Sequence, residues 1–321
     1  MPKRKSVSED DLVDLHGKVA IVTGGNTGIG YATIQMLARK GAKVYMAARS
    51  EERALEAIKQ LQSENINDGS VHWLKLELSD PRAAKRAAQD FLEKETRLDI
   101  LVNNAAKSSP GPFKLDKDGL LDIMVLNHIS HFALADTLLP LMKETAKESG
   151  SDVRIVNVSS MAHSGVKPET FATKEAFNKN YGDSVRGYLN TYGLSKLANI
   201  LHIKELQKRL IAESVPITCI AVHPGPVKTV GADGFLAGIP YFGGILKKYI
   251  GPLVFKPWRH GAMPVAFAAA GKEVLAQRES HRGVYIVPVA SVAQPSSYAL
   301  DERLQKECYE TTEQILAELE P

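Results

Sequence analysis

The sequence predicts an α/β fold: a single-domain, doubly wound parallel sheet of about seven strands with helices on both faces. First, short apolar runs alternate with amphipathic stretches along the chain. Such alternation builds right-handed strand–helix–strand crossovers and therefore a parallel sheet. Second, 321 residues with 44% hydrophobic content are enough for one large core. Third, no internal repeat and no Pro/Gly/Ser-rich linker divides the chain.

The expected strands are short runs of apolar or alternating residues. The first, KVAIVTG, ends in a glycine, and VHWLKLEL alternates with the period of a strand. The run PITCIAVHPG is apolar until it reaches a Pro-Gly turn. The expected strands cover residues 18–24, 42–49, 71–78, 98–106, 153–160, 216–225 and 283–289.

The expected helices lie between these strands and carry apolar residues at helical spacing. IGYATIQMLARKG stops at a glycine, and SDPRAAKRAAQDFLEKE opens with a capping residue and an early proline. Pro140 marks a bend or a break in the fourth helix. The expected helices cover residues 29–41, 51–65, 79–95, 116–148 and 191–213.

The domain boundaries follow from this alternation. Residues 1–16 are expected to form a polar N-terminal tail, and residues 17–321 the single domain. Two segments interrupt the rhythm: a polar insert at 161–189, and a segment at 226–259 rich in Gly, Pro and apolar residues. In doubly wound folds, ligands bind beyond the carboxyl ends of the strands. Because both segments follow strands, we expect both over that edge.

Composition excludes several classes of protein. The net charge is only +3, and no basic stripe is interleaved with aromatic residues, so a nucleic-acid partner is not expected. No apolar run reaches the length of a membrane span. Cys219 and Cys308 show neither metal spacing nor a disulfide framework, so we expect a reducing compartment, the cytoplasm. His128 and His131 lie three apart without a third ligand, so no metal site is predicted.

A glycine-rich turn predicts a dinucleotide site. VTGGNTGIGYA places Gly24, Gly28 and Gly30 directly after the first strand, where the backbone can approach a pyrophosphate at a helix N-terminus. An acidic residue at the end of the second strand would bind a ribose hydroxyl. This chain has Ala48 and then Arg49 at that place. A guanidinium suits a 2′-phosphate, which favours NADP(H) over NAD(H). The alternative is that Arg49 is only a solvated strand-end residue.

The stretch YGLSK places Tyr192 and Lys196 on one face of the helix expected at 191–213. A chain with this many tyrosines and lysines contains such a pair by chance, so its meaning depends on its surroundings. A nearby ammonium favours a phenolate and lowers the pKa of a phenol. The pair can therefore serve as a proton donor and the group that tunes it.

The chain resembles the classical short-chain dehydrogenase/reductase family in six motifs that occur in the family's order. Within that family, NHISHF, VNVSSMAH, YGLSKLANIL and HPGPVKT are most similar to the retinol dehydrogenase and WW-domain oxidoreductase branch. The six motifs are TGGNTGIG (23–30), LVNNAA (101–106), VLNHISHF (125–132), RIVNVSSMAH (154–163), YGLSK (192–196) and HPGPVKT (223–229).

The resemblance implies a Rossmann-type fold and an NADP(H)-dependent interconversion of a carbonyl and an alcohol by hydride transfer. It also implies catalytic roles for Asn127, Ser160, Tyr192 and Lys196. Tyr192 would donate or accept the proton, and Ser160 would hydrogen-bond the carbonyl oxygen. Lys196 would lower the pKa of Tyr192, and Asn127 would position a water that returns the proton through Lys196. In the family's V-S-S pattern the second serine faces the site, so the resemblance implies Ser160, and strand alternation turns Ser159 to the opposite face.

The cofactor contacts are carried over from the same motifs. Glu77 stands where the family often has Asp beside the adenine, and Thr229 where the family contacts the nicotinamide carboxamide. The implied contacts are Thr23, Gly24, Asn26, Thr27, Gly28, Ile29, Gly30, Arg49, Glu77, Leu78, Asn104, Ala105, Tyr192, Lys196, Pro224, Gly225, Val227 and Thr229.

The substrate is expected to be a hydrophobic small molecule. The segment at 226–259 contains GFLAGIPYFGGILKKYIGPLVF, and a substrate lid is favoured over a membrane-surface patch or a dimer contact. The protein is expected to be a monomer or a homodimer. The competing function is a nucleotide-binding regulatory protein with little catalysis on the same fold. Because all four catalytic positions are filled, the enzyme is favoured.

Overall fold

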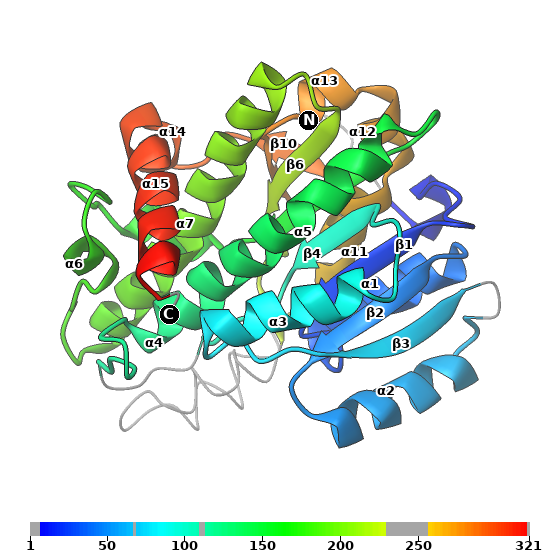
Figure 1. Cartoon of the computed structure of the whole chain (residues 1–321), viewed down its shortest axis with the longest axis horizontal. Helices are drawn as coiled ribbons and strands as arrows, with labels where there is room; N and C mark the ends of the chain where they lie inside the picture. Colours follow the sequence, from blue (N-terminus) through cyan, green and yellow to red (C-terminus); the bar gives the residue numbers. More distant parts are fainter. Residues whose placement is uncertain (1–6, 67–68, 109–112, 229–255, 320–321) are drawn as a thin grey trace.

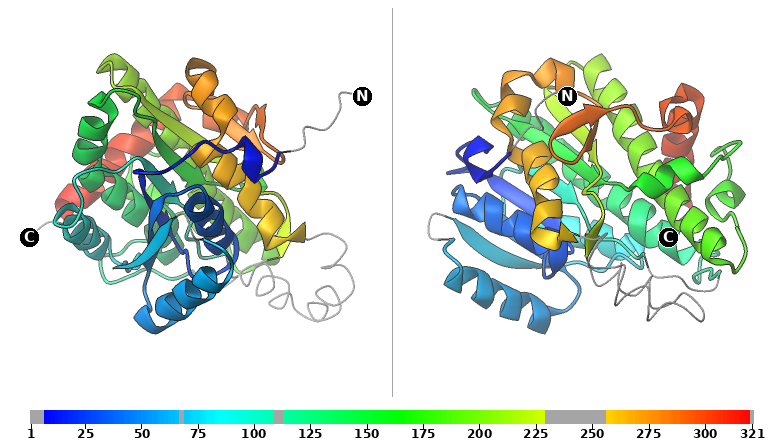
Figure 2. Two further views of the ribbon diagram at one scale, coloured as in Figure 1. Left: turned by 90° about the vertical axis from the view of Figure 1, so that its right-hand side faces the viewer. Right: turned by 180° about the vertical axis from the view of Figure 1, so that it is seen from behind.

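The structure is a computed structural model that describes residues 7–66, 69–108, 113–228 and 256–319 (Figure 1). A twisted sheet runs through the centre, with helices in a layer on either side (Figures 1 and 2). This is the doubly wound α/β architecture that the sequence predicts.

The central sheet has eight strands in the order β10-β9-β6-β5-β4-β1-β2-β3. All neighbours are parallel except β10, which pairs antiparallel with β9. The sequence predicts about seven strands, and β10 is the additional one, a short edge strand. The strands are β1 (Val19–Thr23), β2 (Lys43–Ala48), β3 (Ser70–Lys75), β4 (Ile100–Asn103), β5 (Val153–Val158), β6 (Ile217–Val222), β9 (Tyr285–Val287) and β10 (Ser291–Ala293). A separate parallel pair joins β7 (Val227–Lys228) to β8 (Lys256–Pro257).

Two hydrophobic cores lie on opposite faces of the sheet. Successive residues of β1 alternate between them: Ile21 packs in one core, and Ala20 and Val22 in the other. One core is covered by α3 (Pro81–Leu92), α5 (Ser130–Lys147), α7 (Val185–Ala212) and α15 (Glu302–Glu318). The other is covered by α1 (Gly28–Arg39), α2 (Glu51–Ser63), α11 (Trp258–Ala270) and α12 (Lys272–Ala276).

The helix expected at 116–148 consists of three consecutive pieces. A short α4 (Asp122–Met124) leads into a π-helical turn, η2 (Val125–Ile129), and then into α5. Pro140 lies inside α5, which continues past it without a break. The π turn widens the helix at the position of Asn127, and such turns recur at functional sites.

The polar insert at 161–189 contains structure of its own. It begins with the 3-10 turn η3 (Met161–Gly165) and includes α6 (Lys174–Phe177), whose Phe177 packs edge-to-face on Phe171 in the core. The helix α7 then starts at Val185, earlier than expected, because the Ser184 hydroxyl caps it by accepting from the backbone of Gly187 at 3.0 Å.

The remaining elements cover the ends of the sheet. In the segment expected as a polar tail, Leu12 and Leu15 are buried in the second core beside η1. None of the helices in the described parts of the chain is both long and apolar enough to cross a membrane. The small elements are η1 (Glu9–Asp11), α13 (Arg278–His281) and α14 (Ser297–Leu300).

Candidate active site

A glycine-rich turn connects β1 to α1 at the carboxyl edge of the sheet. Gly24 and Gly28 have φ angles of +64° and +59°, in the left-handed region that favours glycine. A Cβ at Gly30 would collide with the carbonyl oxygen of Gly24. The Thr27 side chain makes no hydrogen bond to the first turn of α1, so the N–H groups there remain available to an anion. The predicted turn residues that are at least partly accessible are Gly24, Asn26, Thr27, Gly28 and Ile29.

The buried Thr23 joins the ends of β1 and β4. Its hydroxyl oxygen accepts from the backbone N–H groups of Asn104 and Ala105, each at 2.9 Å. The Asn104 side chain donates in turn to the carbonyl oxygen of Thr23 at 2.8 Å. With both lone pairs of the Thr23 hydroxyl used, its proton is left to donate to Nε2 of His131, 2.8 Å away.

His131 therefore links the cofactor turn to the π turn. If Nε2 accepts from Thr23, Nδ1 carries the proton and donates to the carbonyl oxygen of Asn127 at 3.3 Å. Burial lowers the pKa of His131 to about 3, so the ring is neutral at physiological pH. Both ring nitrogens are used in this network, which gives His131 a structural role.

The side chain of Asn127 holds the loop that follows β4. Its amide nitrogen donates to the carbonyl oxygen of Lys107 at 3.0 Å and to the hydroxyl of Ser195 at 2.9 Å. Its oxygen accepts from the backbone of Lys107 at 2.8 Å. These contacts fix Asn127 between the β4 loop and α7, so its side chain acts here as a clamp.

Tyr192, Lys196 and Ser160 come together where α7 passes the end of β5. The Ser160 hydroxyl lies close enough to the Tyr192 hydroxyl to favour its phenolate form. The buried Lys196 donates from Nζ to the carbonyl oxygen of Val158 at 2.9 Å, and Nζ lies 5.6 Å from the centroid of the Tyr192 ring. The two serines point apart as predicted, because Ser159 donates instead to the carbonyl oxygen of Lys196 at 2.8 Å.

Burial sets the ionisation of this group. It raises the pKa of Tyr192 to about 12, although the nearby Ser160 hydroxyl acts in the opposite direction. Burial also lowers the pKa of Lys196 to about 7. The expected lowering of the Tyr192 pKa by Lys196 is absent in this state, because desolvation of the phenolate dominates. The phenol is therefore protonated at neutral pH, as a proton donor must be.

The far end of the predicted cofactor site lies beyond β2. The Arg49 side chain is 77% exposed, and its Nε lies 3.7 Å from Oε2 of Glu77. The other oxygen of Glu77 accepts from the backbone of Ser79 at 2.9 Å. Leu78 is buried, and its carbonyl oxygen accepts from the Ser130 hydroxyl at 2.8 Å. Among the described residues the Arg49 guanidinium is thus held by one weak ion pair, and it can reach a phosphate.

The end of β6 supplies the last predicted contacts. Pro224 and Gly225 follow β6 directly, and Gly225 has a φ of +88° where a Cβ would press on Pro288. Val227 begins β7. Thr229 and most of the predicted lid at 226–259 lie outside the described residues.

Known proteins resemble this chain over nearly its whole length. A family model described as short chain dehydrogenase matches residues 18–174. A short-chain dehydrogenase/reductase of Armillaria gallica is 44% identical over 308 residues, which cover 96% of this chain and 95% of that protein. The chain belongs to the short-chain dehydrogenase/reductase family. It is therefore an oxidoreductase that acts on a small molecule, and the predicted family is confirmed.

Other members of the short-chain dehydrogenase/reductase family extend this comparison. Retinol dehydrogenase 12 of Bos taurus is 39% identical over 217 residues, which cover 68% of this chain and 64% of that protein. The solved complex of Pseudomonas aeruginosa RhlG with NADP has a TM-score of 0.62 and 26% identity, and covers 87% of this chain and 97% of that one. The similarity to retinol dehydrogenase 12 agrees with the branch of the family that the motifs suggest.

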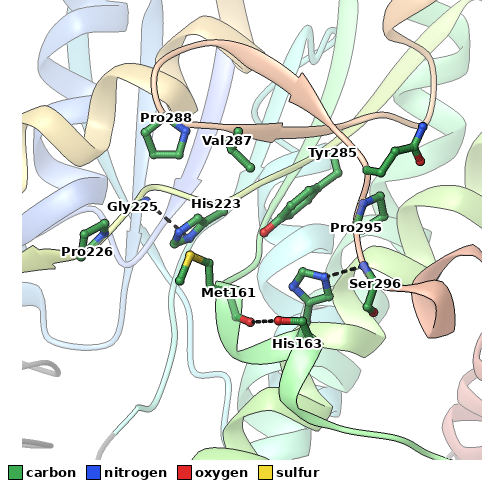
Figure 3. Close-up of a pocket in the computed structure, with 12 residues that line it drawn as sticks. Met161, His163, His223, Gly225, Pro226, Tyr285, Val287, Pro288, Pro295 and Ser296 are labelled. Atoms are coloured by element: carbon green, nitrogen blue, oxygen red, sulfur yellow. Dashed lines mark hydrogen bonds between the residues drawn. The ribbon is translucent and has the colours of Figure 1, made fainter.

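A pocket of about 610 Å³ lies beside the family motifs, at the ends of β5, β6 and β9 (Figure 3). His163 forms part of its wall: Nδ1 donates to the carbonyl oxygen of Ser160 at 2.7 Å, and Nε2 accepts from the backbone of Ser296 at 3.1 Å. The pocket is lined by Met161, His163, Ser164, His223, Gly225, Pro226, Tyr285, Val287, Pro288, Gln294, Pro295 and Ser296.

The sequence did not assign this pocket. His163 and His223 lie in two of the family motifs, which give neither residue a role. Tyr285 lies in the run GVYIVPV, which reads as an ordinary core strand, and Ser296 lies in a loop. The one available signal was a tyrosine hydroxyl within an apolar strand that ends at the ligand-binding edge.

Proposed function

We propose that this protein is an NADP(H)-dependent oxidoreductase that interconverts a ketone or aldehyde and an alcohol, on a hydrophobic small molecule. The observation that carries the proposal is the group formed by Tyr192, Ser160 and Lys196. The protonated Tyr192 phenol lies close to the Ser160 hydroxyl, with the buried amine of Lys196 one helical turn away. This group stands at the same sheet edge as a glycine turn suited to a dinucleotide.

The residues of the glycine turn fit the cofactor. Any side chain at Gly30 would collide with the Gly24 carbonyl, and the uncapped first turn of α1 offers N–H groups to a pyrophosphate. Arg49 would hold a 2′-phosphate, which is the reason to prefer NADP(H). The NADP named with Pseudomonas aeruginosa RhlG supports this preference. When bound, the nicotinamide would supply or accept the hydride.

The chain's own groups would manage the proton. Tyr192 would donate its phenolic proton to the carbonyl oxygen, and Ser160 would hydrogen-bond the same oxygen as negative charge develops there. Lys196 has a pKa near 7, so it can hold or release a proton beside Tyr192 at physiological pH. In its charged form it would stabilise the phenolate that remains.

Asn127 would act as a positioning residue. Its side chain fixes Lys107 in the β4 loop and Ser195 on α7, which keeps the cofactor edge and the Tyr192 helix in register. The water expected beside Asn127 stays a prediction. Cofactor contacts other than those argued above also remain proposals taken from the family motifs.

We place the protein in the cytoplasm as a monomer or a homodimer. Cys219 and Cys308 are both buried as free thiols, which suits a reducing compartment. Cell fractionation and light scattering of the purified protein would test these two assignments separately.

NADPH oxidation measured against a panel of aldehydes and ketones tests the function. The expected result is turnover of at least one hydrophobic carbonyl and its loss in Tyr192→Phe. Tyr188→Phe, one turn earlier on α7, is the matched control and should keep full activity. Unchanged turnover in Tyr192→Phe would refute the mechanism. Absence of turnover with every carbonyl, despite NADPH binding, would favour the regulatory alternative.

A further inference from the structure

The pocket beside η3 contains polar side chains whose hydrogen-bonding capacity is unused. The hydroxyl oxygens of Tyr285 and Ser296 are buried and have no hydrogen-bond partner among the described residues. The whole Tyr285 side chain is 96% buried, since its exposed fraction is 4%. A buried hydroxyl without a partner costs about 1–3 kcal/mol, so one that lines a pocket marks a place where a ligand or a water can bind.

His223 adds a second donor to the same pocket. Its Nδ1 accepts from the backbone of Gly225 at 3.4 Å, which leaves the proton on Nε2. Figure 3 shows the hydroxyl of Tyr285 pointing toward the His223 ring. The His163 ring packs edge-on against Tyr285 with centroids 5.2 Å apart, and this contact holds the tyrosine in place. Two donors, the Tyr285 hydroxyl and His223 Nε2, therefore face one region.

The charge of the pocket limits what it can hold. None of the twelve lining residues within the described parts of the chain is Asp, Glu, Lys or Arg. Burial lowers the pKa of His223 to about 4, with a further contribution from His163, and burial raises the pKa of Tyr285. The side chains of Tyr285, His223 and His163 are therefore all neutral at pH 7. A charged ligand would lose its hydration here without gaining an oppositely charged partner.

Apart from Ser164 and Gln294, the rest of the lining is apolar, and the size is ample. Met161, Pro226, Val287, Pro288 and Pro295 form most of the remaining wall. A volume of about 610 Å³ falls in the range of small-molecule sites, about 300–1,000 Å³. The pocket thus suits the hydrocarbon body of a ligand with a single polar position.

The pocket also borders the proposed catalytic group. Met161 directly follows Ser160, and the Ser160 carbonyl is bonded to His163. Gly225 belongs both to the lining and to the predicted cofactor contacts. A molecule in the pocket would therefore lie next to the place where the carbonyl is expected to react.

We propose that this pocket binds the non-reacting end of an uncharged, mainly apolar substrate through one oxygen that accepts hydrogen bonds from Tyr285 and His223. The substrate class is then a hydrophobic ketone, aldehyde or alcohol that carries a second, neutral oxygen function distant from the reacting carbon. This inference rests on the proposed function, because it places the reacting end beside Ser160.

Calorimetric titration with three compounds of equal chain length tests the inference. They are 2-undecanone, 11-hydroxy-2-undecanone and 10-oxoundecanoic acid, titrated into the protein without cofactor so that no turnover occurs. The hydroxy ketone is expected to bind about three- to tenfold more tightly than 2-undecanone, as one or two neutral hydrogen bonds provide. The carboxylate is expected to bind more weakly than both.

A substitution tests how much of the difference in affinity comes from Tyr285. In Tyr285→Phe the advantage of the hydroxy ketone should fall below about twofold, while the free variant melts at the same or a higher temperature because an unpaired hydroxyl is gone. Tyr298→Phe, outside the lining, should leave all affinities unchanged. Equal binding of the three compounds, no binding of any, or an unchanged advantage in Tyr285→Phe would each overturn the inference.

Failure of the inference can be told apart from failure of the proposed function. If carbonyl reduction still depends on Tyr192 but the three compounds bind equally, only the pocket assignment is wrong. If Tyr192→Phe keeps full turnover, the proposed mechanism is wrong, whatever the pocket binds.

Discussion

The two halves of the ligand-binding edge differ in how their polar side chains are used. On the cofactor side, Thr23, His131 and Asn127 form a closed network in which each donor and acceptor described above has a partner. On the pocket side, Tyr285 and Ser296 keep buried hydroxyls without partners among the described residues. The contrast indicates that one side is preorganised for a constant ligand, and the other keeps hydrogen-bonding capacity for a substrate.

Lys196→Met should have the largest effect on turnover. It also tests whether a residue needed for activity lowers the stability of the folded protein. Turnover should fall about 10²- to 10⁴-fold, the usual contribution of proton-transfer groups. Lys204→Met, two turns later on α7, is the control and should keep turnover. Steady-state rates on both variants measure this, and equal losses would remove Lys196 from the mechanism.

Lys196→Met should also be more stable than the wild type at pH 7. Burial lowers the pKa of Lys196 from its usual 10.5 to about 7, so between these pH values the unfolded chain binds more protons than the folded chain. The loss of wild-type stability caused by burying the Lys196 ammonium is therefore complete below pH 7. It disappears as the pH rises toward 10.5. Urea unfolding should show the advantage of Lys196→Met shrinking over that window. An advantage that grows with pH would contradict the account.

Arg49→Asp should change cofactor choice without touching the pocket. Loss of a charge-assisted bond of about 1.5–3 kcal/mol predicts a KM for NADPH raised roughly tenfold to a hundredfold, with a much smaller change for NADH. Arg53→Asp, on the next helical turn, is the comparison. Parallel shifts for the two cofactors would show that Arg49 is only a solvated residue.

Replacing threonine by valine at positions 23 and 218 compares how a hydrogen-bonded hydroxyl and an unpaired hydroxyl contribute to stability. Thr23→Val leaves the N–H groups of Asn104 and Ala105 without their acceptor, and should lower the free energy of unfolding by about 1–3 kcal/mol and weaken NADPH binding. The Thr218 hydroxyl on β6 is buried without a partner among the described residues, so Thr218→Val should be neutral or stabilising. Urea titrations with equal losses for both would break the comparison.

Acid should destabilise both sides through their buried histidines. The pKa of His131 is about 3 and that of His223 about 4, against a usual 6.5, so the unfolded state binds more protons as pH falls below 6.5. Each of these two histidines then lowers the free energy of unfolding by up to about 1.4 kcal/mol for every unit that the pH falls. His131→Asn and His223→Asn should each flatten this slope, and only His131→Asn should weaken NADPH binding.

The sequence was sufficient wherever the chemistry is local. The glycine turn, the pair formed by Tyr192 and Lys196, and the choice of Ser160 over Ser159 follow from spacing and strand alternation together with the family's motifs. The structure places these side chains as predicted. Their proposed roles still await the experiments above.

The sequence was insufficient where partners are distant along the chain. Thr23 and His131 are 108 residues apart, and His163 meets Ser296 across 133 residues. No periodicity links such pairs, so the network and the pocket became visible only in the fold. The early start of α7 was missed because its Ser184 cap lies inside a segment that reads as polar loop.

The most direct test of the account measures turnover and NADPH affinity on the same preparation of Tyr192→Phe. The rate of NADPH oxidation with a carbonyl that the wild type reduces should fall by about 10²- to 10⁴-fold. The dissociation constant for NADPH should change by less than about tenfold, since one hydroxyl contributes one hydrogen bond. A variant that binds NADPH normally and reduces the carbonyl at the wild-type rate would contradict the role of Tyr192 as proton donor.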